Sequence, residues 1–261
     1  MKRLVSKHTD NPTLYDDDGN ETEKGAKYIE RLKRLSGANY QRYFLGNWSA
    51  AENLVYDAFD PDIHVITEHD TPFQYYLAGV DWGFKDAGVI QMWGIDFDCR
   101  AVLVREVYRT LEDIDWWRKR ALEFDAKYRP KRWVCDSAAP EKISQFHKME
   151  LPVARAKKDI EMGITVVQAK LANQDDGRPG LYILADACRV RDHRLKEDGL
   201  ATNTAGEFWS YAYKDSKDFQ NIDEKPEDFS NHGMDTMRYV LVYLDRFHSS
   251  DTVKKIRRSL R

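Results

Sequence analysis

Three short apolar segments, joined by short connections, restrict the fold of this chain more than any other feature. They cover Tyr75–Asp81, Gly88–Ile95 and Arg100–Tyr108. The connections, residues 82–87 and 96–99, are far shorter than the crossover that parallel strands require. The sequence therefore predicts an antiparallel meander of three strands.

Helices and strands alternate after this meander. A helix is expected over Glu112–Tyr128, ended by Pro130, and a strand over Arg132–Asp136. The other expected elements are helices over Pro140–Met149, Ile160–Gln174 and Ala185–Lys196, strands over Leu181–Leu184 and Glu207–Tyr213, and a closing helix over Gly233–Phe247. Three antiparallel strands, then helix, strand, helix, strand and helix, is the order of the ribonuclease H-like fold. This is an α/β class in which helices flank both faces of a mixed β-sheet.

The first fifty residues differ from the rest of the chain. They are polar and include the acidic run of residues 16–18. They have too few apolar side chains for a core of their own, although helices are expected over residues 23–35 and 38–45. We therefore interpret residues 1–50 as a linker or arm and residues 51–261 as one domain.

The composition excludes several classes of protein. Of 261 residues, 42% are hydrophobic and 33% charged, which permits a core and argues against global disorder. The longest apolar run, Tyr239–Leu244, is far shorter than the ~20 residues that span a bilayer, and the charged N-terminus is unlike a signal peptide. Cys99, Cys135 and Cys188 are too scattered for a disulfide framework, which favours a cytoplasmic setting. A net charge of −3 excludes a uniformly basic surface for nucleic acid, but it does not exclude a local basic track.

Three aspartates stand at the ends of expected elements. Asp81 and Asp136 end strands, and Asp235 lies near the start of the closing helix. A buried carboxylate is costly unless a positive charge satisfies it, so three of them indicate a shared divalent cation. Magnesium prefers oxygen ligands, and two such ions about 3.5–4 Å apart activate a water and stabilise the leaving oxygen of a phosphodiester.

Each aspartate also has a simpler structural explanation. An aspartate at a strand end is often a turn residue or a helix N-cap, which suits Asp136. Asp235 can pair with Arg238, one helical turn away. Taken singly, each aspartate is better explained by structure. The three together, in this order of elements, favour the metal site.

Three further residues are candidates for auxiliary roles. Asp86 follows the first of these strands and is either an outer metal ligand or a carboxylate in a tight turn. His232 either positions a water or phosphate near Asp235, or is a cap or surface residue. Lys158, beside Lys157, either contacts DNA phosphate or belongs to the solvated start of a helix.

Two other segments are less specific. Residues 206–214 alternate aromatic and polar side chains. This pattern is compatible with one arm of a hairpin over the site, but it slightly favours a half-buried edge strand. The basic tail, residues 254–261, either adds phosphate contacts or only improves solubility.

Four stretches of the sequence resemble the C-terminal nuclease part of the large terminase subunit of tailed bacteriophages. Residues 79–84 (Gly-Val-Asp-Trp-Gly-Phe) and 133–141 look like the first and second metal-binding strands of that family. Residues 232–239 are similar to its third metal-binding element, in which a His precedes the Asp by three positions and an Arg-Tyr pair follows. Residues 154–164 look like the segment that enters its long helix.

This resemblance implies a ribonuclease H-like, metal-dependent endonuclease that cuts concatemeric viral DNA during genome packaging. Mg²⁺ or Mn²⁺, as two ions, would be held by Asp81, Asp136 and Asp235. The implied partners are double-stranded DNA, the ATPase domain of the same terminase, the small terminase subunit and the portal protein. The implied location is the host bacterial cytoplasm and not the mature virion. Little sequence preference is expected, because no segment looks like a groove-reading helix.

The sequence departs from the full family in one respect. It contains no Gly-x-x-x-x-Gly-Lys-Ser/Thr, the loop that cradles ATP phosphates. Residues 9–12 and 43–48 resemble the stretch that leaves the family's ATPase domain, so residues 1–50 are expected to lead from an ATPase domain that this chain lacks. Either the chain is a piece of a longer protein or the ATPase is a separate chain. We expect this chain to cut DNA without translocating it.

Three other functions stay open. A ribonuclease H-like junction resolvase is the closest alternative among nucleases. Residues 79–83 also resemble the first phosphate loop of actin-like ATPases, although residues 135–139 lack the glycine that lets backbone approach phosphate. A docking module for the portal or small terminase is the third, and the intact set of aspartates argues against it.

Overall fold

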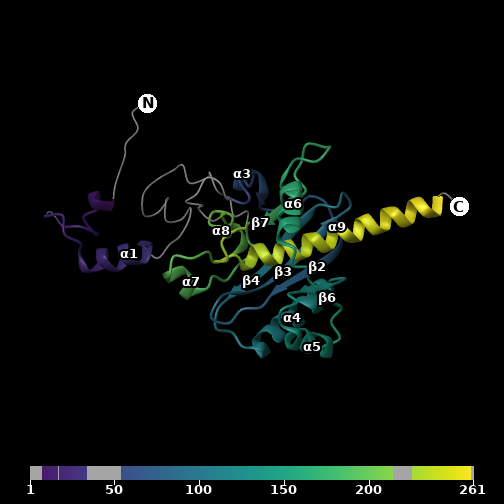
Figure 1. Ribbon diagram of the computed structural model, residues 1–261, viewed down its shortest axis with the longest axis horizontal. Helices are drawn as coiled ribbons and strands as arrows, with labels where there is room; N and C mark the ends of the chain where they lie inside the picture. The colour runs from purple at the N-terminus through teal and green to yellow at the C-terminus, as the bar shows by residue number, and fades with distance from the viewer. Residues whose placement is uncertain (1–7, 17, 34–53, 214–224, 260–261) are drawn as a thin grey trace.

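A seven-stranded mixed β-sheet forms the centre of the protein (Figure 1). The computed structural model describes residues 8–16, 18–33, 54–213 and 225–259. The strand order across the sheet is β1-β7-β4-β3-β2-β5-β6. The strands are β1 (Val65–Ile66), β2 (Phe73–Asp81), β3 (Gly88–Asp96), β4 (Ala101–Arg109), β5 (Trp133–Cys135), β6 (Val153–Arg155) and β7 (Leu181–Leu184).

The antiparallel meander and the later parallel strands that the sequence predicts are both present. Strands β2, β3 and β4 form the antiparallel meander. Strand β5 lies parallel to β2, β6 parallel to β5, and β7 parallel to β4. The α/β fold class, with three antiparallel strands followed by parallel ones, is therefore confirmed.

The helices match the expected order, with shifts at their ends. Helix α4 begins after Asp113, whose side chain accepts a hydrogen bond from Trp116 N, and ends at Arg129, which is left-handed and precedes Pro130. The described helices are η1 (His8–Asp10), α1 (Glu23–Lys33), α3 (Pro61–His64), α4 (Ile114–Tyr128), α5 (Pro140–Lys148), α6 (Ile160–Leu171), α7 (His193–Glu197), α8 (Thr204–Glu207) and α9 (His232–Ser259).

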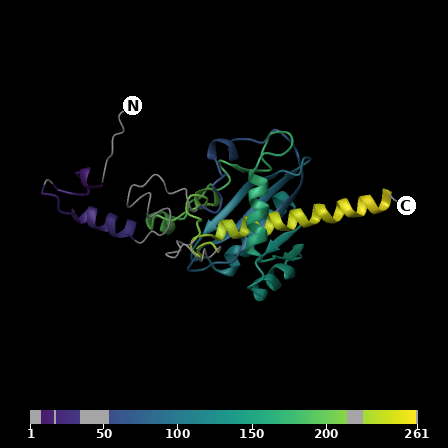
Figure 2. The ribbon, with the colours of Figure 1, turned by 45° about the horizontal axis from the view of Figure 1, so that its top comes forward.

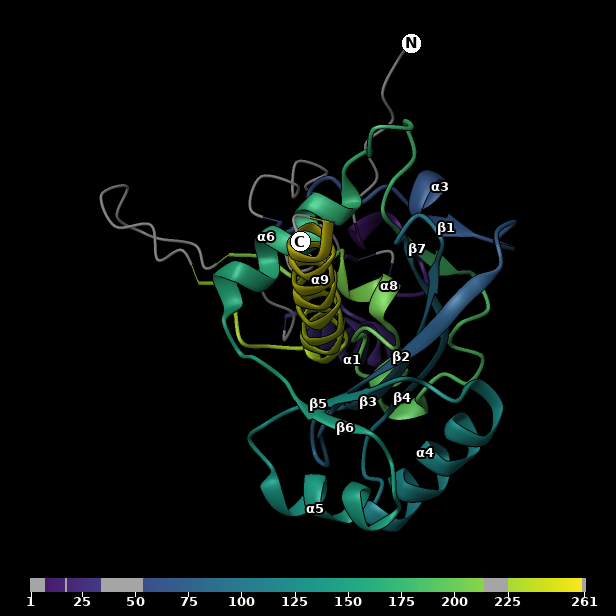
Figure 3. The ribbon, with the colours of Figure 1, turned by 90° about the vertical axis from the view of Figure 1, so that its right-hand side faces the viewer.

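Helices cover both faces of the sheet, which is why β3 is buried along its whole length (Figure 3). On one face α4 and α5 pack on alternate strand residues, such as Val80 and Met92. On the other face α6, α8 and α9 pack on Leu77 and Trp93, and α6 crosses α9 (Figure 2). Alternation along each strand thus divides the core into two layers.

Two predicted elements are wrong. A strand is expected over Glu207–Tyr213, but Glu207 is instead the last residue of α8, a short helix capped by Asn203. Phe208 and Tyr211, three residues apart, point into the core, so the aromatic residues of this segment serve packing on α9. Of the helix expected over Ala185–Lys196, only the end is helical, because Asp192 caps α7 and starts it late.

Two strands are absent from the predictions. Strands β1 and β6 are two and three residues long, too short to show a period of two.

The helix expected over residues 38–45 lies outside the described residues. The described part of the first fifty residues packs in a small cluster around Ile29 and Leu32. The division of the chain at residue 50 stays a prediction. None of the described helices is both long and apolar enough to cross a membrane.

Candidate active site

The sheet brings Asp81 and Asp136 side by side. Asp81 is the last residue of β2, and Asp136 follows β5, the parallel neighbour of β2. In the register of the two strands Val80 lies opposite Cys135, and Asp136 N donates a hydrogen bond to Val80 O at 2.8 Å. The two carboxylates therefore emerge at the same edge of the sheet, and both residues are buried.

Helix α9 adds Asp235 because it approaches β2 closely. A Cβ on Gly79 would lie 2.6 Å from Val240 Cγ2 and 2.7 Å from Thr236 Cγ2. Real Cβ atoms essentially never come this close, so a glycine at this position of β2 lets the first turns of α9 rest on the strand. Asp235 lies on the first of those turns.

The pKa of Tyr239 indicates that the three aspartates lie close together. Burial raises the pKa of Tyr239, and the negative charges of Asp235, Asp81 and Asp136 raise it further. Tyr239 lies one turn after Asp235 on α9. The three predicted site residues thus all lie near enough to one side chain for their charges to act on it.

A cation contacts each of the three aspartates. His232 Nδ1 lies 3.0 Å from Asp81 Oδ2, and Lys158 Nζ lies 2.5 Å from Asp136 Oδ1. Arg238 forms an ion pair with Asp235. Within the described ranges, no three His, Cys, Asp or Glu side chains stand together as a ready-made metal cluster. In this arrangement, each carboxylate is paired with one positively charged side chain.

These cations offset only part of the cost of burial. Burial raises the pKa of Asp81 and the charge of Asp136 adds to it, although His232 and Lys158 act in the opposite direction. Burial likewise raises the pKa of Asp235 to about 6 against the pull of Arg238. A raised pKa means that too little positive charge surrounds a carboxylate to stabilise its ionised form. A divalent cation would supply that charge. The oxygen donors of Asp81, Asp136 and Asp235 therefore fit a hard ion such as Mg²⁺ or Mn²⁺.

The charge of His232 is set by its neighbours. Burial alone lowers the pKa of this imidazole, but the hydrogen bond and charge of Asp81, then Glu207 and Asp235, raise it to about 9. His232 is therefore an imidazolium at neutral pH. Its position at the first residue of α9 joins the helix to the end of β2.

Buried polar side chains fix the start of α9. The Glu207 carboxylate accepts hydrogen bonds from Gly233 N at 3.0 Å, Met234 N at 2.7 Å and the Tyr108 hydroxyl. Gln91 Nε2 donates to Gly233 O at 2.9 Å. The sequence analysis did not single out these residues. Its one available signal, the Thr-x-x-Glu pattern at residues 204–207, is typical of a helix start and does not predict contacts with a distant helix.

The auxiliary candidates differ in their positions. His232 and Lys158 contact the aspartates as described above, whereas Asp86 is exposed in the loop after β2. No hydrogen bond or ion pair links Asp86 to a charged side chain in the described part of the chain. The simpler structural roles are present as well, since Asp136 accepts a hydrogen bond from Ala138 N at 3.0 Å and Arg238 pairs with Asp235. The turn and ion-pair roles thus coexist with the grouping of the aspartates.

Three solved structures share the fold of this chain. A large terminase from a thermophilic bacteriophage, in complex with ATP-γ-S, superposes with a TM-score of 0.59 at 23% identity over 86% of this chain. The P22 large terminase nuclease domain gives a TM-score of 0.53 at 12% identity, over 75% of this chain and 93% of that one. The large terminase nuclease from the thermophilic phage G20c, with bound magnesium, gives 0.51 at 10% identity, over 73% and 97%.

This chain has the fold of a large terminase nuclease domain. The expected ribonuclease H-like architecture is thereby confirmed. The chain spans 53% of the length of the large terminase solved with ATP-γ-S. No protein-family model matches the sequence, and no curated protein matches it either.

Proposed function

We propose that this chain is a metal-dependent endodeoxyribonuclease of the large terminase type. The observation that carries the proposal is the grouping of Asp81, Asp136 and Asp235 at the end of two parallel strands and the start of α9. The terminase fold supports the same function, although a fold alone does not determine an activity.

The three aspartates have distinct positions in this proposal. Asp81, at the end of β2, would help to hold two ions, one together with Asp136 and the other together with Asp235. The ions, when bound, would activate a water and stabilise the leaving oxygen of a phosphodiester. His232 holds the Asp81 carboxylate in place through its Nδ1, and Lys158 does the same for Asp136.

The biological setting follows from the terminase resemblance. The DNA would be a double-stranded concatemer, cut with little sequence preference as a genome is packaged in the host cytoplasm. The ATPase domain, the small terminase subunit and the portal protein would be the partners, and residues 1–50 would lead from the ATPase domain. Phosphate release by this chain alone is not expected, because its sequence has no ATP-phosphate loop.

The experiment is a plasmid-cleavage assay of the wild type and Asp81→Asn, with Mg²⁺ or Mn²⁺, beside a thermal melt in chelator. We expect cutting by the wild type and none by the variant with either metal, because asparagine keeps the shape but loses the charge that binds the ion. Asparagine still accepts a hydrogen bond from His232 Nδ1 and fits the same space, so the variant should remain folded in chelator.

Asp86→Asn is the matched control, since this exposed aspartate lies five residues away in the adjoining loop. It should cut like the wild type. If Asp81→Asn folds and still linearises plasmid at the wild-type rate, the site assignment is wrong. A wild type that cuts only four-way junctions and leaves plasmid intact would favour the resolvase instead.

A further inference from the structure

Three neighbouring hollows lie in a row beside α9. The first, of about 390 Å³, is lined by Asp235, and the second, of about 330 Å³, shares Lys157 and Tyr239 with it. The third, of about 270 Å³, shares Tyr243 and Phe247 with the second. Because neighbouring hollows share lining side chains, they adjoin one another and make up a depression along α9 that starts at the candidate active site.

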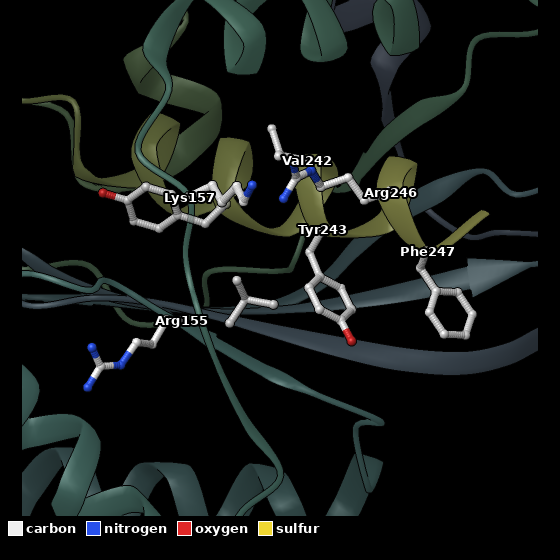
Figure 4. Close-up of a pocket in the computed structure, with 8 residues that line it drawn as sticks. Arg155, Lys157, Val242, Tyr243, Arg246 and Phe247 are labelled. Carbon is white, nitrogen blue, oxygen red and sulfur yellow. The ribbon is translucent and has the colours of Figure 1, made fainter. Parts of the chain in front are cut away.

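One face of α9 forms a wall of this depression. Asp235, Tyr239, Tyr243 and Phe247 follow one another at four-residue intervals, which places them on the same side of a helix. The rings of Tyr243 and Phe247 project from α9 toward the strands (Figure 4). The helix rises about 18 Å from the first of these residues to the last. In duplex DNA each strand has a phosphate every ~3.4 Å of helix axis, and an extended single strand spaces its phosphates more widely, so at most about five phosphates of one strand fit this length.

The second and third hollows are lined by cations and, among the described residues, by no carboxylate. All five cationic side chains are exposed, and none forms an ion pair with a described Asp or Glu. In a chain with a net charge of −3, this is a local concentration of positive charge that attracts a polyanion. The five residues are Lys131, Arg132, Arg155, Lys157 and Arg246.

The small size of the hollows favours one strand over a duplex. A volume of about 330 Å³ lies at the lower end of the range of small-ligand pockets. Tyr243 and Phe247 offer ring surfaces on which unpaired bases stack, and a duplex would keep its bases inside. Lys131 Nζ lies 3.9 Å from the ring centroid of Tyr75, and this cation–π contact keeps the lysine at the far end of the row.

We propose that this depression, the α9 track, binds a single strand of DNA that continues from the candidate active site. The α9 track consists of the five cations named above with Tyr239, Tyr243 and Phe247. The phosphates of the strand would lie along the cations and its bases against the rings of Tyr243 and Phe247, because Tyr239 is buried and only lines the wall. The proposal rests on the proposed function, because the bound strand is one that reaches the aspartates.

The test measures binding and does not depend on cutting. A labelled duplex with a single-stranded overhang and the same duplex with blunt ends are titrated in EDTA over a range of potassium chloride concentrations, by fluorescence anisotropy. The variants are Lys131→Gln/Arg132→Gln and Arg155→Gln/Arg246→Gln. The control is Lys119→Gln/Lys148→Gln, two exposed lysines of α4 and α5 on the opposite face of the sheet.

The wild type should bind the overhang duplex more tightly than the blunt one. Each track variant should lose that preference and lower the salt slope of overhang binding by about 1.4, because each lost contact to a single strand removes ~0.7. The control pair should keep both properties. Equal slopes for the track variants and the control would overturn the proposal, as would equal binding of overhang and blunt duplexes by the wild type.

The two proposals fail separately. If the wild type cuts plasmid and the track variants bind the overhang normally, the α9 track is wrong and the nuclease function stands. If the wild type does not cut with either metal but its overhang binding depends on the four substituted cations, the nuclease function is wrong and the α9 track remains only as a DNA-binding surface.

Discussion

The Glu207 carboxylate accepts a hydrogen bond of 2.7 Å from Met234 N, so a side chain of α8 caps the first turn of α9. Glu207 is wholly buried, and burial raises its pKa to about 8 although Tyr108, Gly233 and Met234 all donate to it. The turn that it holds carries His232 and Asp235. A residue outside the aspartate group thus fixes the geometry of that group.

Glu207→Gln should destabilise the protein and reduce cutting together. The NH₂ group of glutamine cannot accept hydrogen bonds, so at least one buried N–H of Gly233 or Met234 loses its partner, at about 1–3 kcal/mol. Urea unfolding and the plasmid assay measure the two effects. Glu141→Gln is the control, because Glu141 lies in the first turn of α5 but is exposed, and it should leave both values near those of the wild type. Wild-type unfolding of Glu207→Gln would contradict this role.

Gly79→Ala should move α9 away from β2. The added methyl group would meet Val240 and Thr236 at 2.6 and 2.7 Å, and overpacking of this kind costs about 1–3 kcal/mol. Cutting should fall, because Asp235 is positioned by the close approach of α9. Melting temperature and plasmid cleavage are the measurements. Val240→Ala in the same variant removes one of the two contacts and should recover part of the loss in melting temperature. No recovery would mean that the contact with Val240 is not the cause.

Much of the sheet could be predicted because its residues alternate or run continuously apolar. The nine residues of β3 carry their own signal, and each of the three aspartates was found because it ends an apolar segment or starts the closing helix. The grouping of the aspartates follows from the order of the strands. Local pattern and tertiary structure agree at these positions.

The rest depends on contacts between distant parts of the chain. Glu207 binds Tyr108 across 99 positions and Met234 across 27, and no local pattern records such pairs. The aromatic residues near Glu207 suggested a strand, but the core around α9 turned Phe208 and Tyr211 inward from a short helix and its end. Tertiary packing overrode local propensity at this segment.

Lys158→Gln should strengthen metal binding. The ammonium of Lys158 lies 2.5 Å from Asp136 Oδ1 and repels a second cation at that carboxylate. Because Lys158 is partly exposed, solvent weakens this effect, and we expect the half-saturating Mn²⁺ concentration to fall only a few-fold. Titration of Mn²⁺ followed by its electron paramagnetic resonance signal measures it. Lys157→Gln is the matched control, since this neighbouring lysine contacts no described carboxylate. Weaker Mn²⁺ binding by Lys158→Gln would show that the lysine supports the metal site instead.

Stability in chelator should fall as the pH rises from about 6.5 to about 9. The pKa of His232 is raised to about 9 in the folded protein, so in this range the folded state holds a proton that the unfolded state has released. The contribution of the His232–Asp81 pair is therefore complete below pH 6.5 and is lost as the pH rises through 9. Urea unfolding at a series of pH values in EDTA measures this slope. His232→Gln should flatten it, while His147→Gln, on the exposed surface of α5, should not. An unchanged slope in His232→Gln would show that the imidazole is neutral in the folded protein and that its contact with Asp81 is not an ion pair.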